Sequence, residues 1–160
     1  MAAPSLDQLC RAGRAVGLDP AFRYYAGATP VNDRGQLPVL ERFGKALGSG
    51  LRMSREVGLS VPGDRRAWDA RVFGERGHVS VDCEALLGDL QAVTRRVTLK
   101  QRDDPDSGPV ILLVARTAHN RAVLEAHREA LRAVFPLDSA QLLGFLRGGR
   151  LSPAGGVLVM

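Results

Sequence analysis

Residues 77–91, GHVSVDCEALLGDLQ, carry the pattern that decides the fold of this chain. Apolar and polar side chains alternate from residue 77 to residue 84, which predicts a β-strand that buries Val79, Val81 and Cys83 on one face. The same alternation places Asp82 and Glu84 together on the other face. An amphipathic helix is expected from residue 85 to residue 102, because apolar residues recur there at helical spacing. The residues on its apolar side are Leu86, Leu90, Val93 and Val97.

A second alternating run, RRAWDARVF at residues 65–73, precedes this strand and is joined to it by the turn-like stretch 74–77. It carries Asp69, and alternation directs the neighbouring Trp68 to the opposite face, where it is expected to pack in the core. Pairing of the two strands would bring Asp69 close to Asp82 and Glu84. Three carboxylates at the ends of paired strands can hold a divalent cation such as Mg²⁺ beside a phosphate.

Each of these acids also has a purely structural interpretation. Asp69 can equally be the partner of a nearby arginine in its own strand. Asp82 and Glu84 can form a solvated strand face, but two like charges two residues apart repel each other unless a cation or an arginine lies between them. A compensating positive charge is therefore expected beside them, whatever its identity. The arginines that could pair with Asp69 are Arg65, Arg66 and Arg71.

The remaining sequence predicts an α/β domain with a mixed central sheet of about five strands flanked by helices. VILLVAR at residues 110–116 is continuously apolar, as expected for a central strand that is covered on both faces. The expected order of the domain is α, three strands, α, β, α, α, β. Further helices are predicted over residues 5–17, 36–48, 120–135 and 139–147, an extended segment over 21–27, and further strands over 51–61 and 156–160.

Composition limits the class of protein. The chain has 160 residues, of which 45% are hydrophobic and 24% are charged, which fits a single globular core. The formal net charge is +5, an excess that would suit an anionic ligand without requiring one. Cys10 and Cys83 are the only cysteines, so neither a disulfide framework nor a thiolate zinc site is expected. This cysteine usage makes a reducing cytoplasm the simplest setting. No apolar stretch approaches the roughly 18 residues of a membrane span, so a soluble chain without membrane contact is expected.

The order of elements, with an acid in the second strand and a DxE pair in the third, resembles the core of the PD-(D/E)XK nuclease superfamily, also called restriction-endonuclease-like. In that superfamily the edge of the sheet carries the metal site. More closely, five segments resemble the C-terminal domain that follows the helix-turn-helix in actinobacterial XRE-type transcriptional regulators. These segments are LPVLERF, VPGDRRAWDARV, VDCEALLGDLQAVTRRVTLKQRDD, VILLVARTAHNRAVL and VLVM.

This resemblance spans the chain and implies two parts. Residues 1–30 correspond to an N-terminal helix and linker, similar to the closing helix of a DNA-reading domain that would precede this chain. Residues 31–160 correspond to the PD-(D/E)XK nuclease-like domain. Because regulators of this type usually act as dimers, the resemblance also implies a homodimer that works on DNA.

The nuclease pattern assigns roles to individual residues. It makes Asp69 and Asp82 metal ligands, places Glu84 where a lysine is usual, and makes Glu41 the acid of the first helix. The usual lysine orients the attacking water and stabilises the charge that grows on the phosphate, so its replacement bears directly on catalysis. Glutamate at this place also occurs in restriction endonucleases that bind metal through it. Two functions therefore stay open: a Mg²⁺-dependent DNA endonuclease, and a non-catalytic regulator module that senses, binds DNA or dimerises.

The predicted helix after Glu84 supplies further candidates. Lys100 borders its apolar stripe, so the amine either reaches the sheet edge and stabilises the leaving oxygen or simply extends to solvent. Gln91 is a possible accessory residue. Arg95 and Arg96 are either contacts for DNA phosphates or ordinary surface arginines.

Two other polar features are expected to have no functional role. His119 and His127 lack the four-residue spacing of a paired metal site and are expected on the surface. The run DDPDSG at residues 103–108 has acids like those of a calcium loop, but it lacks the length and the closing glutamate, so it predicts a turn.

Overall fold

The computed structural model describes residues 30–160 of the chain. The helix predicted over residues 5–17, the extended segment over 21–27, and Cys10 lie outside the described residues. Within residues 30–160, no helix combines the length and the apolar character needed to cross a bilayer.

A five-stranded mixed sheet forms the centre of the described chain, and its spatial order follows the sequence, β1-β2-β3-β4-β5. The first three strands form an antiparallel meander, whereas β4 is parallel to β3 and β5 is parallel to β4. The prediction of an α/β domain with a mixed sheet of about five strands is therefore confirmed. The strands are β1 (Arg52–Gly58), β2 (Ala67–Gly74), β3 (Gly77–Glu84), β4 (Val110–Val114) and β5 (Gly156–Val159).

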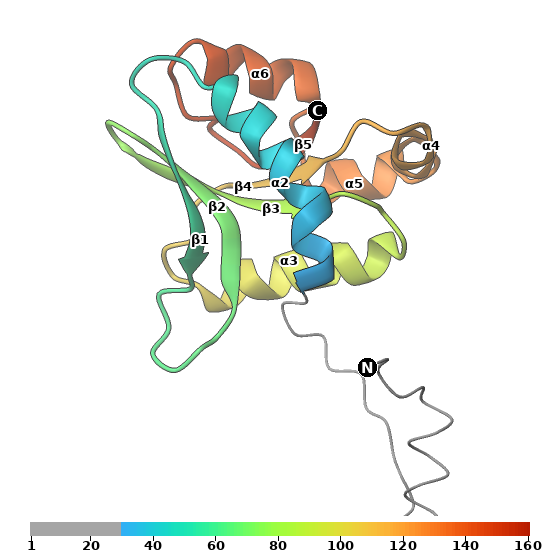
Figure 1. Ribbon diagram of the computed structural model, residues 1–160, viewed down its shortest axis with the longest axis horizontal. Helices are drawn as coiled ribbons and strands as arrows, with labels where there is room; N and C mark the ends of the chain where they lie inside the picture. Colours follow the sequence, from blue (N-terminus) through green and yellow to red (C-terminus); the bar gives the residue numbers. More distant parts are fainter. Residues whose placement is uncertain (1–29) are drawn as a thin grey trace, which may run out of the picture.

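Helices cover both faces of this sheet, with α2 and α6 on one side and α3 on the other (Figure 1). All five residues of β4 are buried, as its continuous apolar sequence predicted. The helices are α2 (Pro30–Lys45), α3 (Leu90–Asp103), α4 (Ala118–Ala126), α5 (Arg128–Val134) and α6 (Ser139–Arg147).

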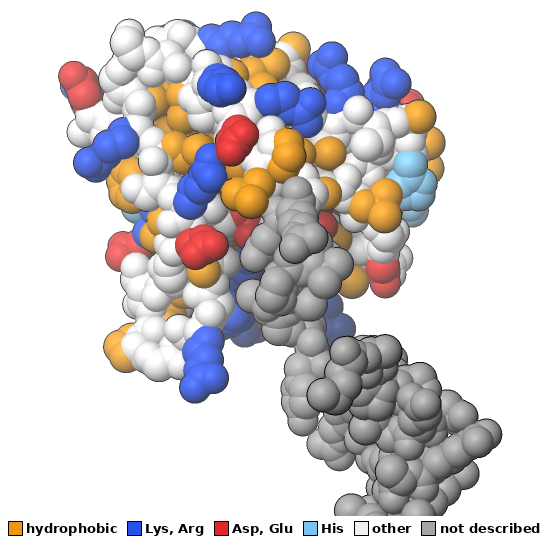
Figure 2. Space-filling view, viewed as in Figure 1, with side chains coloured by type: hydrophobic (Ala, Val, Ile, Leu, Met, Phe, Trp, Pro, Cys, Tyr) orange, Lys and Arg blue, Asp and Glu red, His pale blue; other side chains and the backbone are white. Residues whose placement is uncertain are grey.

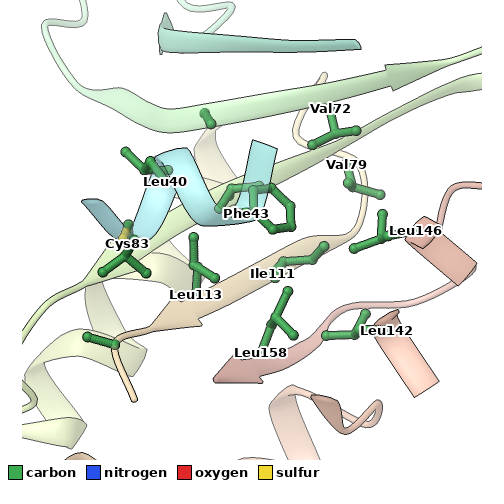
Figure 3. Packing of buried hydrophobic residues seen from close by; sticks show 14 residues of the cluster. Leu40, Phe43, Val72, Val79, Cys83, Ile111, Leu113, Leu142, Leu146 and Leu158 are labelled. Carbon is green, nitrogen blue, oxygen red and sulfur yellow. The ribbon is translucent and has the colours of Figure 1, made fainter. Parts of the chain in front are cut away.

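Alternation along β3 and β4 divides the core into two apolar layers. On one face Leu40 and Phe43 of α2 lie against side chains of β3 and β4, including Cys83 and Leu113 (Figure 3). On the other face the apolar stripe of α3 packs on the even-numbered residues of β4. That second layer consists mainly of Trp68, Leu87, Leu90, Val93, Val97, Leu112, Val114, Leu131 and Phe135.

The hairpin between β2 and β3 fixes the register of the two strands that carry the acids. Gly74 pairs with Gly77, so only residues 75 and 76 form the turn. Gly77 has a φ of 123°, a conformation that residues with side chains rarely adopt. The resulting register pairs Ala70 with Val81, which places Asp69 beside the end of β3.

Helix α3 begins five residues later than the sequence pattern predicted. Asp89 is the N-cap, because its side chain accepts a hydrogen bond from the Ala92 N–H at 3.0 Å. The residues from Ala85 to Gly88 connect β3 to α3 instead. Leu86, which was predicted to lie on the apolar side of the helix, is 65% exposed. The helix predicted over 36–48 is also shifted, since α2 spans Pro30–Lys45.

The prediction of a single helix over residues 120–135 is wrong. The chain forms α4 and α5 instead, and His127 lies between them with φ −118° and ψ 20°. No glycine or proline occurs between residues 118 and 134, so the local sequence gives no sign of this break. His119 and His127 are both exposed, as predicted.

Side-chain alternation in β2 breaks beside Asp69. Trp68 belongs to the apolar layer under α3, whereas Ala70 belongs to the layer under α2, although regular alternation would put both on one face. The break faces a distortion in β1, where Glu56 has a φ of 50° between the pairs Arg55–Ala70 and Val57–Trp68. Trp68 is fully buried, so the prediction that it packs in the core is confirmed.

Candidate functional site

Five charged side chains from three elements meet where α3 crosses the ends of β2 and β3. Strand β2 supplies one acid, β3 supplies the DxE pair, and α3 supplies two cations one helical turn apart. Residues four apart on a helix lie on the same face, so both cations can point at the sheet. We call this group the charged cluster; its members are Asp69, Asp82, Glu84, Arg96 and Lys100.

Asp82 lies at the centre of the charged cluster. Its side chain is 1% exposed, and both of its oxygens contact a cation. Oδ1 lies 2.6 Å from Nζ of Lys100, and Oδ2 lies 2.7 Å from a guanidinium nitrogen of Arg96. Ion pairing of this kind compensates the free energy lost when a carboxylate leaves water.

Lys100 reaches the sheet from the last turn of α3. Its stem forms part of the buried face of the helix, and its ammonium group donates to the Ala67 carbonyl at 2.7 Å as well as to Asp82. The ammonium also lies 5.3 Å from the centre of the Trp68 ring, within the range of a cation–π contact. Lys100 therefore points inward, toward the sheet, and does not extend to solvent.

Arg96 joins the two carboxylates of β3. It forms ion pairs with Asp82 and with Glu84, while its own side chain is 45% exposed. Burial alone would lower the pKa of Arg96, but the two carboxylates outweigh burial and raise that pKa. Arg96 is thus the compensating charge that the DxE spacing required, and its partner interactions set it apart from the exposed Arg95.

The carboxylates of Asp69 and Glu84 are less fully neutralised by cations than the carboxylate of Asp82 is. Burial raises the pKa of Glu84, and Arg96 offsets part of that increase. Burial and the nearby Asp82 charge raise the pKa of Asp69 to about 6, although its Oδ2 accepts a hydrogen bond from the Cys83 N–H at 2.6 Å. With Asp69 ionised, three carboxylates face two cations; with Asp69 protonated, the charges balance.

The geometry bears directly on metal binding. Mg²⁺ needs several oxygen ligands in a nearly octahedral arrangement, at about 2.0–2.1 Å. Among residues 35–160, no three His, Cys, Asp or Glu side chains are arranged so that they could hold a metal ion. Both oxygens of Asp82 and one oxygen of Glu84 are already bonded to α3. In this arrangement Arg96 and Lys100 supply the positive charge beside Asp82 and Glu84.

Other predicted residues lie apart from the charged cluster. Glu41 and Gln91 are exposed, and neither side chain forms a hydrogen bond or ion pair with another residue of the described chain. Asp69 is not paired with any of the three arginines proposed for it. In the described structure Arg66 pairs with Asp64 and Asp103, Arg71 pairs with Asp104, and Arg65 is exposed.

Two buried polar residues that the sequence pattern did not single out hold the surroundings of the cluster in place. Asp104 accepts hydrogen bonds from Trp68 Nε1 and Arg71, both at 2.8 Å. Asn120 accepts from the Leu87 N–H and donates to the Ala85 and Ala115 carbonyls, which fixes the connection between β3 and α3. A polar side chain at the start of a helix or in a turn is a weak signal, so neither role could be found from spacing alone.

We expect Asp69→Asn to stabilise the fold near neutral pH and to have little effect in acid. The pKa of Asp69 is raised from 3.8 to about 6, so the folded state binds this proton more tightly than the unfolded chain does. The contribution of Asp69 to stability is therefore complete below the unfolded pKa and is lost as the pH rises through about 6. Asparagine keeps an acceptor for the Cys83 N–H and carries no charge.

Urea denaturation measures this effect. The free energy of unfolding of Asp69→Asn is expected to exceed the wild-type value by about 1–3 kcal/mol near pH 8, and the difference should disappear near pH 4. An equal difference at both pH values would show that the Asp69 charge is not responsible.

No family model matches the chain, and neither a curated protein nor a solved structure matches it.

Proposed function

We propose that residues 31–160 are the nuclease-fold domain of a DNA-associated transcriptional regulator, and that its charged cluster is non-catalytic. The observation that carries this proposal is the position of Asp82, whose two oxygens are bonded to Lys100 and Arg96. A residue that binds a catalytic metal must offer its oxygens to that metal. Here α3 supplies the positive charge from within the chain.

The arrangement of the elements supports the nuclease-like part of the proposal. A helix precedes an antiparallel meander, a second helix follows it, and β4 then pairs in parallel with β3. Because β2 and β3 are antiparallel, the acid near the start of β2 lies close to the acids near the end of β3, which supports the PD-(D/E)XK resemblance. The replacement of the usual lysine by Glu84 supports loss of catalysis, because Glu84 adds negative charge where the phosphate charge has to be stabilised.

Surface charge supports an anionic partner such as DNA. Figure 2 shows Lys and Arg side chains gathered over α2 and α6, and the last turns of these helices carry Arg42, Lys45 and Arg147. Arg95 on α3 is exposed, so it can contact a phosphate, whereas Arg96 would first have to leave its two carboxylates. The proposal includes a second copy of the chain as partner, in keeping with regulators of the type it resembles.

A Mg²⁺-dependent DNA endonuclease is the alternative, and one observation favours it. Asp69 adds a third carboxylate to a cluster with two cations, and burial together with the nearby Asp82 charge raises its pKa. In this alternative Asp69, Asp82 and Glu84 would hold the metal, which would supply an activated water and neutralise the phosphate. Lys100 would then stabilise the leaving oxygen.

A Mg²⁺ titration followed by thermal unfolding separates the two functions. For the wild type we expect no rise in Tm with Mg²⁺ and no cleavage of supercoiled plasmid with Mg²⁺ or Mn²⁺. Arg96→Gln removes one of the two internal cations, so its free energy of unfolding in EDTA should fall by about 1–3 kcal/mol, and Mg²⁺ should restore part of that loss. Arg95→Gln is the matched control, because the neighbouring arginine is exposed and should leave both measurements unchanged.

An active endonuclease would give the opposite result in these two measurements. If Mg²⁺ raises the Tm of the wild type, and if plasmid cleavage is seen with the wild type but is lost in Asp69→Asn, the domain is an endonuclease. Asp69→Asn keeps the size of the side chain, so a loss of cleavage in this variant is not expected to result from unfolding.

A further inference from the structure

A cavity of about 590 Å³ lies between α4, α5, the start of α6 and strand β5. Its volume falls within the range of roughly 300–1,000 Å³ that is typical of small-molecule sites. None of its lining residues belongs to the charged cluster. We propose that this arginine cavity, defined by Arg121, Arg128, Arg132, Leu124, Phe135 and Val157, binds a small organic anion with an apolar body.

Part of the lining of the arginine cavity is apolar. Leu131 and Phe135 are buried, while Leu124 and Val157 are half-buried at its wall. The backbone of β5 offers few free polar groups here, because the Val157 N–H donates to the Leu137 carbonyl and the Val159 N–H donates to Ser139 Oγ, each at 3.0 Å. A ligand with an apolar body would therefore displace water without leaving these groups unpaired.

The charged residues of the lining leave two arginines uncompensated. Arg128 forms an ion pair with Glu125, and Asp138 caps α6 by accepting from the Gln141 N–H at 2.9 Å. Within the described part of the chain, Arg121 and Arg132 form no ion pair. Two guanidinium groups without a carboxylate partner beside an apolar wall favour a ligand that carries a carboxylate, sulfonate or phosphate.

The break between α4 and α5 is what lets both arginines line one cavity. Arg121 and Arg132 are 11 residues apart, so on one straight helix they would be separated by about 16 Å along its axis. The change of direction at His127 allows both to line the same cavity. The unpredicted break in the helix thus shapes the site.

The anionic dye 1-anilinonaphthalene-8-sulfonate is a suitable probe, because it joins a sulfonate to an aromatic body and fluoresces when bound. We expect saturable binding by the wild type and an affinity at least about tenfold weaker for the double variant Arg121→Gln/Arg132→Gln, equivalent to the loss of one charged hydrogen bond. The neutral analogue N-phenyl-1-naphthylamine should bind both proteins equally. Both arginines are exposed, so the double variant should keep the wild-type Tm.

Arg147→Gln provides the control, since Arg147 is an exposed arginine of α6 that does not line the cavity. It should bind the dye as the wild type does. The proposal is overturned if the wild type shows no saturable binding, if the double variant binds as tightly as the wild type, or if Arg147→Gln weakens binding equally. None of these outcomes bears on the Mg²⁺ titration, so the two proposals fail separately.

Discussion

Asp82→Ala is expected to lower the free energy of unfolding by about 3–5 kcal/mol, a large part of the stability of a domain of this size. Asp82 is 1% exposed and bonds to both cations of the charged cluster, Arg96 and Lys100. Removing it would leave the Lys100 ammonium, which is 10% exposed, with only the Ala67 carbonyl and the Trp68 ring as partners. Urea denaturation followed by the fluorescence of the single tryptophan measures the loss.

A double variant identifies the cause of that loss. In Asp82→Ala/Lys100→Met neither buried charge of this pair remains, so the double variant should be more stable than Asp82→Ala alone. Glu84→Gln is the control, because Glu84 shares Arg96 with Asp82 but does not contact Lys100. If Asp82→Ala unfolds within about 1 kcal/mol of the wild type, the ion pairs do not stabilise the fold.

Asp104→Ala is expected to be as damaging as Asp82→Ala, with a loss of about 3–5 kcal/mol, because it removes four hydrogen bonds at a buried position. Asp104 is 1% exposed and accepts from Trp68, Arg71 and the backbone N–H groups of Ser60 and Asp106. Burial would raise its pKa, but these hydrogen bonds outweigh burial and lower it. Its contribution to stability is therefore present above the usual carboxyl pKa and is lost as the pH falls.

The adjacent Asp103 is a natural comparison for Asp104. Its side chain is 27% exposed and pairs with Arg66 and Arg102, which are more exposed still. Asp103→Ala should therefore lower the free energy of unfolding far less than Asp104→Ala does. Equal losses in the two variants would contradict the central role assigned to Asp104.

The strands were predictable because each has a local pattern. Alternation fixed β2 and β3, and the uninterrupted apolar run fixed β4 as a central strand. The start of α3 also had a local signal, since Asp89 precedes the first buried residue, Leu90, but the apolar spacing from Leu86 outweighed it. The break at His127 had no such signal, because no glycine or proline occurs between residues 118 and 134.

The charged cluster was predictable in part. Alternation grouped Asp82 with Glu84, and repulsion between them required a positive charge nearby. Spacing could not choose Arg96 over its neighbour Arg95, because that choice depends on the direction in which α3 crosses the sheet. Three of the four partners of Asp104, which are Ser60, Trp68 and Arg71, could not be predicted either, since they lie more than 30 residues away along the chain.

The sequential order of the sheet has a consequence for synthesis on the ribosome. Each strand can join the edge left by the strand before it, so β1 to β4 can assemble as the chain emerges. The apolar strand β4, however, keeps one bare edge until β5 arrives, more than 40 residues later. An unpaired apolar edge invites aggregation. The nascent domain therefore passes through a stage in which protection of this edge by a chaperone would have most value.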